Sequence, residues 1–271
     1  MQRLISKPAT GISSRPDSVR FRGHRGGYIP MHRALAHFRL GPMNLFASVS
    51  LVLFFTWIWA AFLPRLCRFW STIFSLGLLY LPLDARLDQA EHRVAKLVLQ
   101  IPYLRIEPVL PTLTMWSLTC LVVLALFTAS FFFSKQLLPL VYLLRVMLLI
   151  QGSALVFFAL FPGSFPHTPD GYMSALVSSG IGLVSVVPLL FGFTYYIFDF
   201  GLWRKALLTA VTITHLSLFL PFQVLLQALI LQKTTMFMPL LYIVFGMPLD
   251  IMVIIALYSW GMTWSFRPAN S

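Results

Sequence analysis

Charged residues are scarce in this sequence. Asp, Glu, Lys and Arg make up 10% of the 271 residues, whereas hydrophobic residues make up 58%. Water-soluble domains contain about 25% charged and about 45–50% apolar residues. A chain with so few charges lacks the polar surface that a water-soluble fold needs. The composition therefore excludes a soluble protein and predicts an integral membrane protein.

Cysteine is also rare, since only Cys67 and Cys120 are present. A disulfide framework or a cysteine-rich metal site needs more of them. The sequence contains no nucleotide-binding loop, zinc-protease helix or serine nucleophile elbow. Only one of the six histidines lies inside an apolar run, so a pair of histidines cannot hold a haem within the bundle. We therefore expect no cofactor, no metal and no catalytic residue, although the sequence leaves an enzyme open.

Acidic residues number eight against twenty Lys and Arg, which gives a net charge of +12. Eight of the basic residues precede residue 40, and six lie between Arg65 and Arg105. These positions flank apolar runs, where basic side chains meet anionic lipid headgroups. We expect the partners to be a lipid bilayer with anionic headgroups and other membrane proteins, and not nucleic acid.

The first forty residues differ from the rest of the chain. Residues 1–40 are rich in Arg, Ser, Gly and Pro and show no apolar periodicity, so they predict a disordered basic tail. A single membrane domain is expected over 41–267. The Arg-rich, acid-poor tail also matches the composition of a mitochondrial transit peptide. A translation start at Met31 or Met43 is a further alternative.

Long apolar runs are what the sequence has in abundance. About 20 mostly apolar residues form one membrane-spanning helix. The segment 69–83 is only marginally long enough and is a re-entrant segment, an interfacial helix or a seventh short span. The predicted fold class is an all-α polytopic bundle of about six spans, at 44–64, 112–134, 137–162, 180–200, 206–231 and 236–262.

Six spans place both termini on the side of the short loops that carry Lys135 and Arg204-Lys205. The 163–179 loop, on the other side, has no Lys or Arg. This positive-inside pattern predicts cytoplasmic termini, and we favour a cell inner membrane, with the mitochondrial inner membrane as the alternative. The six basic residues of the 65–111 connection oppose this orientation, but long loops count less in the rule.

The same connection contains an amphipathic pattern. Six apolar residues recur at helical spacing, and charged residues occupy the other face, so we predict an in-plane interfacial helix at about 84–101 that ends before Pro102. The apolar residues are Leu83, Leu87, Ala90, Val94, Leu97 and Ile101.

Ionisable residues inside spans are costly and are candidates for function. Arg145, His215 and Asp250 lie at similar depths, at roughly 12, 14 and 18 Å from the same membrane face at 1.5 Å per residue. An Arg145–Asp250 ion pair with His215 nearby is therefore feasible, either as a structural pair or as a substrate or proton site. Asp199 lies at the end of its helix.

A break in the last span is also predicted. Asp250 follows Gly246-Met247-Pro248, and Pro248 removes a backbone hydrogen bond beside the carboxylate. Broken membrane helices are where ions and polar groups can be coordinated. The predicted spans also contain three glutamines, Gln151, Gln223 and Gln227. They either line the same cavity beside Asp250 or form hydrogen bonds between helices, and we favour the hydrogen bonds.

The loop 163–174 is a weaker candidate at the opposite face. His167 and Asp170 are three residues apart, a spacing that suits a general acid and base or two metal ligands. The alternative that we favour is a turn in which Asp170 caps the next helix.

Three functions fit these observations. The first is a non-catalytic accessory or scaffold subunit of a membrane-associated assembly, which the absence of catalytic motifs favours. The second is a transporter or channel-like protein with its site at Arg145, His215 and Asp250. The third is a membrane enzyme that acts on a lipid through His167 and Asp170.

Overall fold

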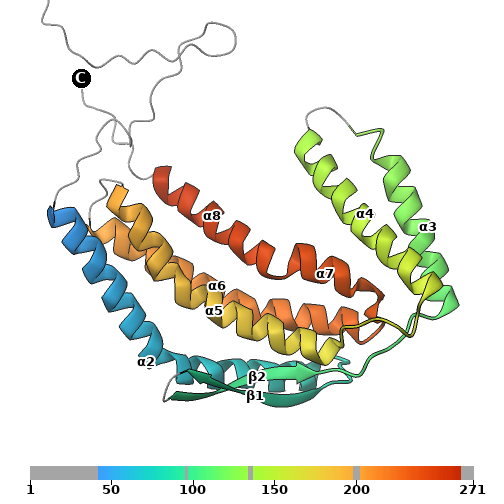
Figure 1. Cartoon of the computed structure of the whole chain (residues 1–271), viewed down its shortest axis with the longest axis horizontal. Coiled ribbons are helices and arrows are strands. Elements are labelled where there is room, and N and C mark those ends of the chain that lie inside the picture. The colour runs from blue at the N-terminus through green and yellow to red at the C-terminus, as the bar shows by residue number, and fades with distance from the viewer. Residues whose placement is uncertain (1–41, 95–96, 134–136, 198–201, 264–271) are drawn as a thin grey trace, which may run out of the picture.

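The computed structural model describes residues 42–94, 97–133, 137–197 and 202–263, so the predicted tail lies outside the described residues. Over the described residues the chain is a bundle of apolar helices with one β-hairpin (Figure 1). This confirms the all-α membrane fold class. Five helices are long and apolar enough to cross a membrane, and a sixth apolar helix, Leu113–Ala129, is shorter, so the span count is approximate.

The first helix, α2 (Pro42–Tyr80), joins the predicted span 44–64 to the marginal segment 69–83 in one 39-residue helix. Pro64 lies inside it, and a proline has no N–H for the preceding turn and kinks a helix. Figure 1 shows α2 bending so that its second half runs beside the hairpin. Trp70 and Phe74 of that half are fully buried. The segment is therefore a continuation of α2 and not a separate span.

The hairpin replaces the predicted interfacial helix, and that prediction is wrong. Strand β1 (Arg86–Val94) pairs with β2 (Leu97–Arg105) in an antiparallel ladder in which Ala90 faces Ile101. The hairpin packs on the second half of α2 and on α5 through β2.

The reason for the error lies in the spacing of the apolar residues. Leu83 and Leu87 are four apart, a distance that satisfies the periods of a helix and of a strand alike. Ala85 between them also packs on the core, whereas Asp84 and Arg86 are exposed. The true period is two, and a pattern of period two forms a strand with one buried face.

The remaining helices follow in sequence order. Helix α5 begins eleven residues before the predicted span 180–200, and the predicted span 236–262 is divided at Gly246. The bounds are α3 Leu113–Ala129, α4 Leu138–Leu160, α5 Pro169–Ile197, α6 Leu202–Leu231, the short 3-10 helix η2 Thr235–Phe237, α7 Met238–Phe245 and α8 Met247–Thr263.

Helices α2, α5 and α6 form the core with β2, and α8 packs mainly on α5, α6 and α7. Helix α3 packs on α4, and α4 contacts the rest of the bundle through α7 and η2. Figure 1 shows the start of α2 and the end of α8 at one end of the bundle and the hairpin at the other. The number of membrane crossings and the side that each end faces stay predictions.

Three tryptophans hold neighbouring helices together through their indole N–H groups. Trp59 of α2 donates to Ser185 Oγ of α5 at 2.7 Å. Trp70 donates to the carbonyl of Ser217 on α6 at 2.8 Å. Trp116 of α3 donates to the carbonyl of Leu155 on α4 at 2.9 Å. In an apolar solvent such bonds add direction to helix packing that dispersion alone does not specify.

Candidate functional site

The interruption between α7 and α8 carries the main polar cluster of the bundle. Gly246 separates the two helices, and its carbonyl accepts a hydrogen bond from the Leu249 N–H of α8 at 3.1 Å. Carbonyls at the end of a helix lack the helical partners that interior carbonyls have. The amide of Gln223 on α6 donates to the carbonyls of Phe245 and Gly246, and Gln227 donates to Phe245 as well. The broken backbone is thus bonded by side chains of the neighbouring helix, as membrane-buried irregular backbone requires.

Two further side chains complete this cluster. The Tyr172 hydroxyl of α5 donates to Gln227 Oε1. Asp250 lies in the first turn of α8 and is 1% exposed. Its Oδ1 atom and Gln223 Oε1 have no hydrogen-bond donor among the described residues. Buried oxygen atoms without donors are costly, and a cation, a proton or a water molecule bound here would satisfy them.

Arg145 is not part of this cluster. Its Nε atom donates to Ser130 Oγ at 3.1 Å, a terminal nitrogen lies 3.3 Å from the Ser130 carbonyl, and the guanidinium lies 4.5 Å from the centre of the Phe131 ring. Ser130 ends α3, where carbonyls lack helical partners and attract a cation. The structure therefore joins Arg145 to the end of α3 and not to Asp250.

His215 also lies apart from Asp250. It is on an exposed face of α6, and its ring stacks on Phe219 with centroids 5.7 Å apart. Equal depth thus did not bring the three predicted residues together, because depth says nothing of the direction in which each helix face points. Their role as one functional site stays a prediction, and Asp199 lies outside the described residues.

The loop candidates occupy different surroundings. His167 is exposed and lines a cavity of about 610 Å³ with Tyr172 and Tyr242. Asp170 does not line it. The N-terminus of α5 is capped by Thr168, whose Oγ1 accepts from the Gly171 N–H at 3.2 Å, and not by Asp170 as expected. Asp170 lies in the first turn, where a carboxylate favours the helix dipole.

The glutamines confirm the reading that we favoured, since each bonds to the backbone of another helix. Gln151 donates weakly to the Met236 carbonyl at 3.5 Å, away from the α7–α8 interruption. Sequence reasoning identified Asp250, Gln223 and Gln227 but missed Tyr172. No sequence signal marks Tyr172, because its partner depends on how α5 and α6 pack together.

Within the described ranges, no three His, Cys, Asp or Glu side chains lie close enough to hold a metal ion. The polar chemistry of the site therefore comes from one carboxylate, amides and hydroxyls.

Compared with protein-family models, curated proteins and solved structures, the chain has no match in any of the three sets.

Proposed function

We propose that this chain is a non-catalytic membrane protein that acts as an accessory or scaffold subunit of a membrane-associated assembly. The observation that supports the proposal is the pair formed by α3 and α4. No residue of helix α3 is fully buried, although the helix is mostly apolar. Figure 1 shows α4 diverging from α8 towards the end that carries the α3–α4 connection. We infer that helices of a partner protein pack on this pair.

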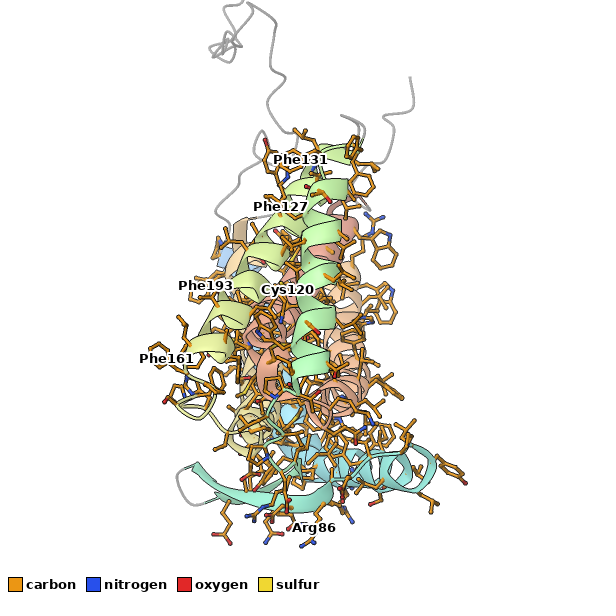
Figure 2. All side chains as sticks on the ribbon, turned by 90° about the vertical axis from the view of Figure 1, so that its right-hand side faces the viewer. Arg86, Cys120, Phe127, Phe131, Phe161 and Phe193 are labelled. Carbon is orange, nitrogen blue, oxygen red and sulfur yellow. The ribbon has the colours of Figure 1, made fainter. Side chains whose placement is uncertain are left out.

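The surface of the pair suits helix packing. Figure 2 shows Phe127 and Phe131 near one end of α3 and Cys120 near its middle, far from the charged hairpin that carries Arg86. Large apolar side chains are exposed on both helices, among them Leu121 at 66% and Leu149 at 74%. Lipid tails satisfy such a surface as well as protein does, so the proposal requires a direct test.

The test is photo-crosslinking in native membranes. A photoreactive residue is placed at Leu121 on α3 or at Leu149 on α4, with Leu53 of α2, 65% exposed, as the matched lipid-facing control. We expect one identical protein adduct at the two α3–α4 positions and none at Leu53. Lipid adducts alone at all three positions would contradict a partner on this surface.

The proposed membrane is a cell inner membrane with both termini on the cytoplasmic side, and the mitochondrial inner membrane is the alternative. The basic residues Arg204 and Lys205 near one end of the bundle support this orientation under the positive-inside rule. Sequencing the N-terminus of the mature protein distinguishes the two membranes, since cleavage within residues 1–40 would indicate organellar import.

Cation- or proton-coupled transport is a second candidate function, which the Asp250 cluster specifically favours. A buried carboxylate oxygen without a donor beside a broken helix is the arrangement that coupling ions use. The probe is sodium or potassium alone. We expect either salt to raise the unfolding temperature of the purified chain more than choline does, and Asp250→Asn to abolish the difference.

Asp88→Asn is the matched control for that experiment, because Asp88 is an exposed hairpin acid outside the cluster. It should retain the response to sodium or potassium. The carboxylate has no ion-binding role if two results are found together. One is that neither cation raises the unfolding temperature, and the other is that a change of pH shifts the unfolding temperature of wild-type and Asp250→Asn protein equally.

A further inference from the structure

A second cavity lies between α2 and α6, and none of the residues of the α7–α8 polar cluster lines it. Its volume is about 540 Å³, within the roughly 300–1,000 Å³ of ligand pockets. Almost all of its lining is apolar, and its charged or hydroxyl-bearing lining residues are Arg65, Thr214 and Ser217. Phe55, Phe62 and Ala210 are among its apolar lining residues.

The cavity has a polar end and an apolar end. The hydrogen bond from Trp70 to the Ser217 carbonyl places Ser217 level with the turns of α2 that follow Arg65. Phe55 lies ten residues before Arg65, roughly 15 Å along the helix, and Ala210 lies seven before Ser217, roughly 10 Å. Because α2 and α6 run in the same direction (Figure 1), Phe55 and Ala210 both lie further from the hairpin end than Arg65 and Ser217 do.

The polar end lies where α2 bends towards the hairpin. The hairpin carries exposed charges such as Arg86 and Glu91, and charged side chains belong at the headgroup level of a membrane. Arg65 is exposed, and among the described residues no acidic side chain forms an ion pair with it. Ser217 Oγ is buried and lacks a hydrogen-bond partner in the described part of the chain.

We propose that this cavity binds one anionic phospholipid of the surrounding bilayer. The Arg65 guanidinium binds the phosphate, since its planar fork matches phosphate oxygens. The ester region of the lipid lies beside Thr214 and Ser217, which line the polar end. One acyl chain follows the apolar walls from Phe62 towards Phe55. The single cation Arg65 beside a long apolar wall suits an anionic amphiphile better than a water-soluble anion, because a water-soluble anion has no acyl chain to fill the apolar part of the cavity.

The proposal is tested on the full chain reconstituted in nanodiscs of equimolar phosphatidylglycerol and phosphatidylcholine with matched acyl chains. Native mass spectrometry after release counts the lipids that stay bound. We expect wild-type protein to retain one phosphatidylglycerol in preference to phosphatidylcholine. Arg65→Gln should reduce that preference about tenfold or more, as the loss of a charge-assisted hydrogen bond does.

Arg68→Gln is the matched control, because Arg68 is an exposed arginine one turn further along α2 that does not line the cavity. It should retain the wild-type preference. Ala210→Phe fills the apolar end with the charge intact and should reduce retention of the bound lipid. Equal loss in Arg65→Gln and Arg68→Gln would show a general surface charge effect and overturn the site.

Two further results would also overturn the proposal. One is retention of phosphatidylcholine as strongly as phosphatidylglycerol by wild-type protein. The other is unchanged retention in Ala210→Phe protein whose unfolding temperature equals that of wild type, because a lipid whose chain lies in the cavity cannot remain when the cavity is filled.

Discussion

Arg145 illustrates how one side chain satisfies its charge without an acid. Its guanidinium is bonded to Ser130 and lies over the Phe131 ring, all within the α3–α4 pair. One carbonyl, one hydroxyl and an aromatic face therefore replace the carboxylate that the sequence offered. The charge holds the C-terminal end of α3 against α4. Arg145 thus joins two helices, as the predicted Arg145–Asp250 ion pair would have done.

This arrangement predicts two different double-mutant cycles, measured by thermal unfolding in detergent. Arg145→Gln and Ser130→Ala should be coupled by about 0.5–1.5 kcal/mol, because they share a hydrogen bond. Arg145→Gln and Asp250→Asn should be additive within about 0.5 kcal/mol. Coupling above about 1 kcal/mol in the second cycle would restore the ion pair that equal depth suggested.

The hairpin acid Asp88 makes stability depend on pH. The Gln89 backbone N–H, the Tyr103 hydroxyl and Arg105 hold the pKa of Asp88 below its ordinary value. A lowered folded-state pKa stabilises the fold above the unfolded value of about 4, and this contribution is lost as the pH falls through the folded-state pKa.

We therefore expect wild-type protein to unfold at a higher temperature than Asp88→Asn at neutral pH. The difference should disappear as the solution is acidified below about pH 4. Tyr103→Phe removes one donor to Asp88 and should give an intermediate difference. A difference that grows on acidification would mean that the pKa of Asp88 is raised.

Among the elements, the hairpin departs furthest from the sequence prediction, and cysteine crosslinking tests it. Glu91 faces Gln100 across the two strands, where Cα atoms are about 4.5–5.5 Å apart. In a helix the same residues would be about 13.5 Å apart. In a chain without Cys67 and Cys120, Glu91→Cys with Gln100→Cys should form a disulfide rapidly.

The out-of-register pair Asp88→Cys with Gln100→Cys is the control and should crosslink much more slowly. Equal rates for the two pairs would indicate a mobile segment, and slow rates for both would favour the helix.

The elements also show how far sequence reasoning reaches. Long apolar runs gave the helices, because membrane insertion depends on composition over about 20 residues. Boundaries were less certain: α2 continues through Pro64, since the turns on either side of a proline can remain helical. The break near Asp250 was predicted from Pro248, whereas the bonds of Gln223 and Gln227 to that break were not. Tyr172 and the Arg145 contacts depend on helix rotation, which hydropathy does not encode.

For the whole molecule, the arrangement of ends is directly testable. In sealed vesicles of one orientation, an impermeant thiol reagent should reach single cysteines that lie at one end of the bundle only. Phe132→Cys and Trp203→Cys, at exposed positions beside the α3–α4 and α5–α6 connections, should react together. Ser164→Cys and Lys233→Cys, which are also exposed, should react only in vesicles of the opposite orientation. Reaction of all four from one side would contradict six crossings.

Several polar bonds of the molecule join segments that are far apart along the chain. Gln232, just after α6, bonds through its amide to the Pro82 carbonyl and the Asp84 N–H, about 150 positions earlier. Trp59 and Trp70 of α2 also await partners on α5 and α6. During synthesis, therefore, α2 and the hairpin are made before these partners on α5 and α6 exist. The α3–α4 pair is local and can close at once. The early half of the protein, in contrast, becomes native only after α6 has been made, which is the last long helix translated before the α7–α8 unit.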